Sequence, residues 1–337
     1  MRVTALQKPK EISTIEAPVP TRKPSEALIR VRAAGICGSD IAAYRGMNPL
    51  VSYPRVIGHE VAGEIEEIDQ NSQGLKKGDR VILDPYLYCG HCYPCSIKRN
   101  NCCENLKVIG VHVDGGMKEF IAHPADMLIS VPDTISWAHI PLAEPMTIAL
   151  HALHRTKLKN NEYIAINGAG TIGLLTAIIA KTYGAEPILI DLVEERLAMS
   201  RALGIVHTIN PIKQRLLPAL QALTDGRMPE VVVEASGANQ AIRNTLDMVS
   251  YAGRIALTGW PKSETSMPTD LITKKELDIC GSRNSAGEFE EAIRLLSSGE
   301  VNAQAIISQY ITFDEIPDMV EELSDHPERY LKVNVLL

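Results

Sequence analysis

The sequence contains no long hydrophobic run. Its longest apolar stretch, around Ile172 to Ala180, is far shorter than the ~20 residues that a membrane-spanning helix needs. The N-terminus also lacks a charged segment followed by an apolar one, which is the pattern of a secretory signal. We therefore expect no membrane partner and a cytoplasmic location.

An excess of positive charge is also missing. The net charge is -7, and Lys and Arg are scattered along the chain, so no basic patch is predicted for nucleic acid. Internal repeats, low-complexity segments and a Pro/Ser-rich linker are absent as well. With 337 residues, 45% of them hydrophobic, the chain is long enough for two globular domains. We expect a small-molecule partner.

The two halves of the sequence differ in hydrophobic pattern. Up to about Ile140, short β-rich runs alternate with Gly, Pro and Asp turns, which predicts a compact β domain. From about Tyr163, apolar runs alternate with helical stretches, which predicts a doubly wound parallel sheet. These later runs cover residues 163–167, 187–191, 230–234, 254–258 and 277–281.

The C-terminal segment is expected to fold back onto the first domain. It contains a helix-like stretch from Phe289 to Ser298, a β-like run around 306–313 and a final strand at 331–337. We therefore predict one domain from residues 1–140 and 285–337, and a second from residues 141–284.

Four of the seven cysteines crowd into one short loop. Cys89, Cys92, Cys95 and Cys103 form a C-x2-C-x2-C-x7-C pattern, which favours metal over disulfides in a reducing compartment. Four thiolates around one tetrahedral Zn²⁺ leave no open position, so we predict a structural zinc. The alternatives are Cys102 as the fourth ligand, and buried cysteines that pack as small hydrophobic residues.

A second group of metal-binding side chains is spread over three segments. Cys37 lies in a Gly-Ile-Cys-Gly-Ser-Asp segment, His59 and Glu60 lie in a Gly-His-Glu segment, and Glu144 precedes a proline. Taken singly, they could be a core cysteine, a hydrogen-bonded histidine and a glutamate that ends a segment. Together they supply the S, N and O donors of a catalytic zinc, which keeps one exchangeable position.

A glycine-rich turn follows the run at 163–167. In a G-x-G-x-x-G pattern that opens a helix, backbone amides approach a pyrophosphate. The residues of this turn predicted to bind cofactor are Gly168, Gly170, Thr171, Ile172 and Gly173. Further candidates end the later runs: Ser236, Thr258, Ser282, Arg283 and Asn284.

Asp191 ends the next run, where a carboxylate accepts a hydrogen bond from the adenosine 2'-hydroxyl and repels a 2'-phosphate. This position favours NAD over NADP. A plain turn aspartate is the alternative, and Arg196 nearby could receive the phosphate of NADP.

Taken in order, these segments resemble the zinc-containing medium-chain dehydrogenase/reductase family over essentially the whole chain. The resemblance also rests on residues 78–81, on Gly115-Gly116 with Glu119, and on Glu144-Pro145. It implies a GroES-like catalytic domain, a Rossmann cofactor domain and a homodimer or homotetramer. It further implies that Cys37, His59 and Glu144 bind the catalytic zinc, with Glu60 beside it as an exchanging ligand, and that Arg196 packs over adenine.

The resemblance also implies roles around the catalytic zinc. Ser39 is expected to accept the first proton, the alternative being a plain turn serine, and Asp40 is expected to orient His59. Many relatives carry a histidine five residues after the zinc cysteine, where this chain has Ala42. We therefore expect the proton to leave through water, the ribose or a substitute such as His112, with a changed pH dependence.

Residues 53–60, 89–97, 108–112 and 281–284 most resemble the sorbitol-dehydrogenase-like branch, and within it bacterial L-galactonate or L-gulonate dehydrogenases. The resemblance predicts oxidation of a secondary hydroxyl of a sugar acid, with Arg283 or Arg45 as partners for its carboxylate. Polyols, polyol phosphates such as galactitol 1-phosphate, and L-threonine are alternative substrates. A non-catalytic zinc- and nucleotide-binding regulator is disfavoured because the ligands and Ser39 are present, and a quinone reductase because those chains lack both zinc sets.

Overall fold

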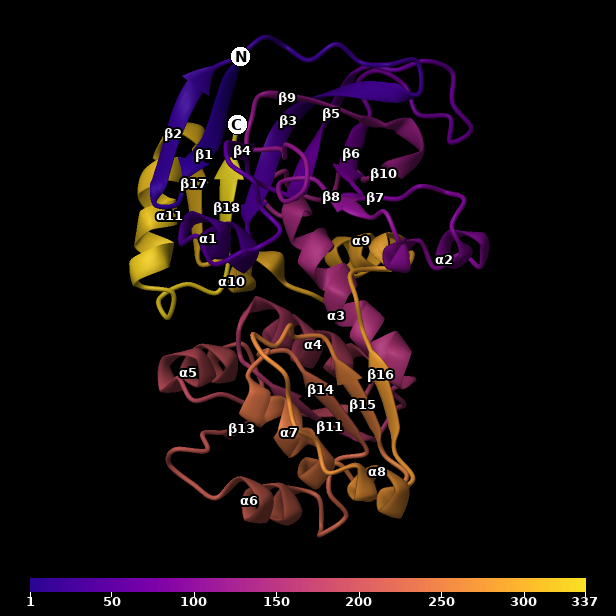
Figure 1. Ribbon diagram of the computed structural model, residues 1–337, viewed down its shortest axis with the longest axis vertical. Helices are drawn as coiled ribbons and strands as arrows, with labels where there is room; N and C mark the ends of the chain where they lie inside the picture. Colours follow the sequence, from indigo (N-terminus) through magenta and orange to yellow (C-terminus); the bar gives the residue numbers. More distant parts are fainter. The chain divides into compact units, whose positions relative to one another are not determined.

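The computed structural model describes residues 1–337 and divides the chain into two compact units (Figure 1). Unit 1 comprises Met1–Glu144 and Phe289–Leu337, and unit 2 comprises Pro145–Glu288. Helix α3 (Ala143–Thr156) contains the boundary between them. None of the helices combines the length and the hydrophobicity needed to span a bilayer.

Unit 1 is built on a seven-stranded sheet in the order β10-β6-β5-β3-β18-β17, with β9 also paired to β3. Strand β3 (Glu26–Ile36) pairs antiparallel with β5 (Glu60–Glu67) and with the C-terminal strand β18 (Val333–Leu336). The returning tail therefore completes the sheet that the N-terminal part of the chain begins. The other strands of unit 1 are β1 (Arg2–Lys8), β2 (Glu11–Glu16), β4 (Arg55–Val56), β6 (Arg80–Leu83), β7 (Tyr86–Leu87), β8 (Lys107–Val108), β9 (Phe120–Pro124), β10 (Leu128–Ser130) and β17 (Gln309–Thr312).

Two apolar clusters hold this sheet together. Along β3, Ala27, Ile29 and Val31 alternate into one cluster, as expected for a strand with one buried face. A register shift between Val31 and Ala33 moves the clustered positions to Ala34 and Ile36, which pack in a second cluster with α1 and α11. The helical segments of unit 1 are α1 (Gly38–Tyr44), α2 (Tyr93–Ser96), η1 (Asn100–Cys102), η2 (Ala125–Met127), η3 (Ile140–Leu142), α9 (Phe289–Ser298), α10 (Ala303–Ile306), η4 (Phe313–Glu315) and α11 (Ile316–Asp325).

Unit 2 contains a six-stranded, fully parallel sheet in the order β13-β12-β11-β14-β15-β16. The central strands are apolar and buried throughout, because helices cover both faces of such a sheet. The strands are β11 (Tyr163–Asn167), β12 (Glu186–Ile190), β13 (His207–Ile209), β14 (Val231–Glu234), β15 (Arg254–Leu257) and β16 (Asp278–Gly281). The helices are α4 (Thr171–Thr182), α5 (Glu194–Ala202), α6 (Leu216–Leu223), α7 (Asn239–Met248) and α8 (Thr269–Lys275). The predicted doubly wound sheet is confirmed.

Candidate functional site

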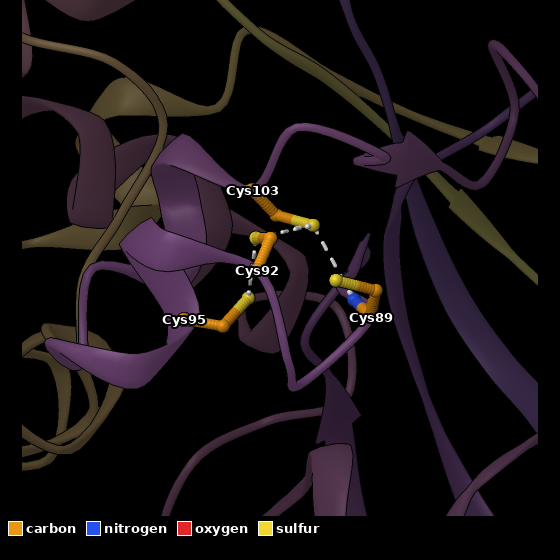
Figure 2. A group of neighbouring side chains, drawn as sticks. All are labelled: Cys89, Cys92, Cys95 and Cys103. Atoms are coloured by element: carbon orange, nitrogen blue, oxygen red, sulfur yellow. Dashed lines mark hydrogen bonds between the residues drawn. The ribbon is translucent and has the colours of Figure 1, made fainter.

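The four cysteines of the predicted structural site converge. The Sγ atoms of Cys89, Cys92, Cys95 and Cys103 lie within 4.8 Å of one another (Figure 2). Helix α2 places Cys95 one turn after Cys92, with 3.4 Å between their sulfurs. Such a group fits a tetrahedral zinc with no open position for a substrate.

Backbone amides set the charge and orientation of this group. The N–H of Cys89 donates to the sulfur of Cys103 at 3.3 Å. N–H groups of His91 and Cys92 lower the pKa of Cys89 to about 6, whereas burial raises the pKa of Cys95. A bound cation would favour the thiolate form of all four, because a metal deprotonates the thiols that coordinate it.

Cys102 lies outside the four-sulfur group. Its sulfur accepts a weak hydrogen bond from Arg99, with 3.8 Å between sulfur and nitrogen. The geometry therefore favours Cys103 as the fourth ligand.

The second centre is assembled by the pairing of β3 with β5. Cys37 follows the end of β3 and caps α1, while His59 immediately precedes β5. One ligand atom each from Cys37, His59 and Glu60 lies within 4.8 Å of the others, and His59 and Glu60 are buried. This mixed donor set fits a zinc with a further position left for another ligand.

Asp40 fixes the two segments that carry Cys37 and His59. Its Oδ2 accepts from the N–H of Cys37 at 3.0 Å, and its Oδ1 accepts from the N–H of Gly58 at 3.3 Å. Oδ1 is also 3.9 Å from Nδ1 of His59. Burial raises the pKa of Asp40, although His59 and these amides oppose that rise. The contacts are those of an orienting carboxylate.

The side chain of Glu60 passes over Gly35 and contacts Lys332 in the C-terminal segment. It is paired with Gly35 in the sheet, and a Cβ at Gly35 would lie 1.8 Å from Oε2 of Glu60. Oε2 forms an ion pair with Nζ of Lys332, which also donates to the carbonyl of Ile36 at 2.9 Å. Lys332 is 3% exposed, and it was not among the site residues predicted from the sequence.

Glu144 takes a neighbouring position at the start of α3. It is buried, and its Oε1 accepts a hydrogen bond from the hydroxyl of Tyr86. Burial raises the pKa of Glu144 to about 7. Burial also opposes protonation of His59, but the charges of Cys37, Asp40 and Glu144 hold the pKa of His59 well above its usual range. These acidic groups outnumber their cationic partners, which favours a bound cation.

The close triad contains three of the four residues predicted at the catalytic zinc. Glu60, rather than Glu144, completes the group with Cys37 and His59, while Glu144 is held by Tyr86. Tyr86 could not be predicted from sequence, because its contact with Glu144 depends on the tertiary fold.

The structure places the other polar candidates of this region in different surroundings. The buried Oγ of Ser39 has no hydrogen-bond partner. Nδ1 of His112 accepts from the N–H of Val108 at 3.0 Å within a turn. Arg45 donates to Oγ of Ser324 at 3.1 Å and to its carbonyl, so it joins α1 to α11. These bonds to α11 account for Arg45 and argue against its proposed contact with a substrate carboxylate.

The glycine-rich turn lies between β11 and α4, as predicted. Gly168 has a φ of +99°, and a Cβ at Gly173 would lie 1.8 Å from the carbonyl oxygen of Gly168. Gly170 caps α4, whose first residues are Thr171 and Ile172. The turn therefore presents the N-terminus of a 12-residue helix, where backbone N–H groups favour an anion.

Asp191 lies beside this turn at the end of β12. Its Oδ2 accepts from the N–H of Ala169 at 2.6 Å, and its Oδ1 accepts from the N–H of Val193 at 2.8 Å. Nη1 of Arg196 is 4.0 Å from Oδ2. Each carboxylate oxygen can accept a second hydrogen bond, so Asp191 keeps the capacity to bind a ribose hydroxyl.

The later candidates lie at the carboxyl ends of β14, β15 and β16. Ser236 donates to the buried carboxylate of Glu234, which also accepts from the N–H of Gly237. The hydroxyls of Thr258 and Ser282 are buried without a hydrogen-bond partner. The carboxyl edge of a doubly wound sheet is where ligands bind.

The segment after β16 carries the last two candidates. The guanidinium carbon of Arg283 lies 5.9 Å from the ring centroid of Trp260, and Asn284 has a φ of +53°. Trp260 is 68% exposed, so the pair presents an aromatic face and a cation to solvent.

Comparisons with known proteins agree with both units. Residues 23–133 match the alcohol dehydrogenase GroES-like domain, and residues 171–298 match the zinc-binding dehydrogenase domain. An uncharacterized zinc-type alcohol dehydrogenase-like protein of Haemophilus influenzae is 56% identical over 337 residues, which cover 100% of this chain and 98% of that protein. An L-galactonate-5-dehydrogenase of Escherichia coli is 34% identical over 95% of this chain and 94% of its own length.

A solved structure from Escherichia coli CFT073 is described as the short chain alcohol dehydrogenase rspB complexed with the cofactor NADH. It superimposes with a TM-score of 0.93 and 33% identity, covering 100% of this chain and 99% of that one. Fold, domain matches and donor sets together define a zinc-dependent dehydrogenase. The chain belongs to the zinc-dependent medium-chain dehydrogenase/reductase family, in its sorbitol-dehydrogenase-like branch.

Proposed function

We propose that this dehydrogenase oxidises a secondary hydroxyl of a hexonate sugar acid, such as L-galactonate or L-gulonate, with NAD as hydride acceptor. The observation that carries the proposal is the Cys37–His59–Glu60 group, in which His59 and Glu60 are buried, together with the unpartnered hydroxyl of Ser39 two residues after Cys37. The relative that acts on L-galactonate supports the sugar-acid class. The product would be a keto-hexonate.

Cys37, His59 and Glu60 would hold the catalytic zinc, with Glu144 close by as an alternative ligand. A zinc bound there would act as a Lewis acid that lowers the pKa of the substrate hydroxyl. Asp40 keeps the Cys37 and His59 segments in register, and Lys332 holds Glu60. We assign Cys89, Cys92, Cys95 and Cys103 to a structural zinc.

Ser39 would accept the proton of the substrate hydroxyl. Its Oγ is free to accept, whereas Asp40 is engaged by two backbone amides. Ala42, the fifth residue of the same helix, has no group that can pass the proton on. His112 is engaged in its own turn, so water or the cofactor ribose would receive the proton.

NAD would bind at the carboxyl edge of the parallel sheet. The family and the NADH-complexed relative support zinc and NAD as the cofactors. In this chain the turn from Gly168 to Gly173 would receive the pyrophosphate, and Asp191 would bind the adenosine ribose. Arg196 would pack over the adenine. Ser236, Thr258, Ser282 and Asn284 would line the remainder of the cofactor.

Arg283 is the cation we assign to the carboxylate of the sugar acid; its guanidinium carbon lies 5.9 Å from the ring centroid of Trp260. A guanidinium can bind a carboxylate through two parallel hydrogen bonds. Assembly as a homodimer or homotetramer stays a prediction of the family resemblance.

The test is NADH formation with L-galactonate, L-gulonate, D-mannonate, sorbitol, galactitol 1-phosphate and L-threonine, and with NADP in place of NAD. We expect one hexonate to give the highest kcat/KM with NAD. Replacing Arg283 by Gln should raise KM for that hexonate by about 10- to 100-fold and leave KM for sorbitol unchanged. A preference for sorbitol or for the polyol phosphate would overturn the sugar-acid assignment, and a zinc-loaded protein without any turnover would favour the non-catalytic alternative.

A further inference from the structure

One buried side chain belongs to the surroundings of both candidate metal centres. Tyr86 is 5% exposed and lies on β7, three residues before Cys89. Its ring is part of the apolar cluster of the cysteine loop, together with Cys95, Cys103 and Leu106. Its hydroxyl donates to Oε1 of Glu144, outside that loop.

The backbone of Tyr86 is fixed independently of that hydroxyl. Tyr86 pairs with Val108 in the short β7–β8 ladder, and its N–H donates to Oδ1 of Asp84 at 3.1 Å. The carbonyl of Asp84 in turn accepts from Nε2 of His123 at 2.9 Å. The ring therefore has a defined position as long as the cluster of the cysteine loop is packed.

We propose that Tyr86 is a positioning residue that orients Glu144 at the catalytic zinc and makes this orientation depend on the structural zinc loop. The proposal rests on the proposed assignment of the two zinc centres. A hydrogen bond to a carboxylate beside a metal fixes the direction of its oxygens and tunes it as a ligand. Here the donor is fixed by the packing around Cys95 and Cys103, so a loosened loop would release the carboxylate.

The backbone connects Tyr86 directly to the first cysteine of the structural zinc loop. The chain runs from Tyr86 to Cys89 with two residues between them, and the aromatic ring contacts the same core that the cysteines form. The hydroxyl of Tyr86 is bonded directly to the planar ring, so a displacement of the ring also displaces the hydroxyl. The structural zinc would thereby influence the site of Cys37, His59 and Glu60, called here the open centre, without any contact with substrate.

The first test is zinc affinity at the two centres, measured by chelator competition without substrate or NAD. Tyr86→Phe keeps the ring and removes the hydroxyl. It should lower the zinc affinity of the open centre by about 10- to 100-fold and leave the zinc affinity of the four-cysteine site unchanged. The visible spectrum of cobalt placed in the open centre should change as well. The matched control is Tyr88→Phe, since Tyr88 packs against the same cluster, whereas the hydrogen bond to Glu144 comes from Tyr86.

The second test asks whether the loop acts through the hydroxyl. Leu106→Ala removes cluster packing without changing a ligand or Tyr86. It should lower zinc affinity at the open centre several-fold in the wild-type background and have no further effect in the Tyr86→Phe background. Equal effects of Leu106→Ala in both backgrounds, or unchanged zinc affinity and cobalt spectrum in Tyr86→Phe, would overturn the proposal. Neither readout uses a substrate, so an incorrect sugar-acid assignment would appear only in the turnover panel.

Discussion

The two candidate metal centres use cysteine in opposite ways. Cys89, Cys92, Cys95 and Cys103 come from one loop of 15 residues, and their sulfurs fill every position of a tetrahedral site. Cys37, His59 and Glu60 come from separate segments that are joined by the β3–β5 pairing, and they leave a position open. A closed site can only hold structure, whereas the open site can also bind and activate a substrate.

The surroundings of the two centres differ as well. In the closed centre, the backbone amides of Cys89 and Asn105 donate to the sulfur of Cys103. The open centre is surrounded by Asp40, Glu144 and the Glu60–Lys332 ion pair, all of them buried. Burying several charged groups costs folding free energy unless they are paired or bind metal. Such clusters are typical of functional sites, which agrees with a catalytic role for the open centre.

The largest expected effect is a loss of activity when a ligand of the open centre is removed. Cys37→Ala removes one ligand of the open centre, so NADH formation should fall by more than about 10³-fold, because the electrostatic stabilisation of the reacting oxygen is lost. The protein should keep one zinc per chain, measured by elemental analysis. Wild-type turnover in this variant would contradict the assignment of the open centre.

The next effect separates them by stability. Cys103→Ser breaks the closed centre, so thermal unfolding should occur about 10 °C lower, because metal binding contributes to folding free energy. Cys102→Ser is the matched control and should unfold at the wild-type temperature. If the two variants exchanged these results, Cys102 would be the fourth ligand.

A smaller effect compares two serine hydroxyls. Ser39→Ala should lower kcat by about 10²-fold with zinc content unchanged, because the first proton acceptor is removed. Ser96→Ala removes a hydroxyl beside the closed centre, where it donates to the carbonyl of Tyr93, and should leave kcat unchanged. A Ser39→Ala enzyme with the kcat of the wild type would exclude Ser39 from the proton path.

The smallest effect concerns the unit that carries both centres. Burial lowers the pKa of His123 from 6.5 to about 4, so the fold favours the neutral ring. The resulting stability is present above about pH 6.5 and is lost as the pH falls toward 4; at pH 5 the loss should be about 2 kcal/mol.

Urea unfolding at several pH values measures this contribution. His123→Asn should remove this part of the pH dependence, while substitution of the exposed His326 by Gln should preserve it. An unchanged pH dependence in His123→Asn would show that other groups cause the acid sensitivity.

The same contrast explains what the sequence could predict. The closed centre was predictable because its ligands lie within one loop, and the β11 strand and helix α9 coincide with the predicted runs at 163–167 and 289–298. The edge strand β13 was not predicted, since it has only three residues. Helix α11 was not predicted either.

Around the open centre, sequence reasoning named the ligand types but not their supports. Tyr86 and Lys332 lie 58 and 272 residues from the carboxylates they contact, so only the fold brings them together. The resemblance implied Glu144 as a ligand and Glu60 as an exchanging ligand, and the close triad contains Glu60.

In the proposed function, the substrate is oxidised at the open centre alone. Brief treatment with a chelator such as dipicolinate, followed by zinc analysis and an NADH-formation assay on the same sample, distinguishes the two centres. We expect that loss of the first zinc per chain removes all activity, that the second zinc remains bound, and that added zinc restores turnover. Activity that survives loss of the first zinc, or that falls only with the second, would contradict this expectation.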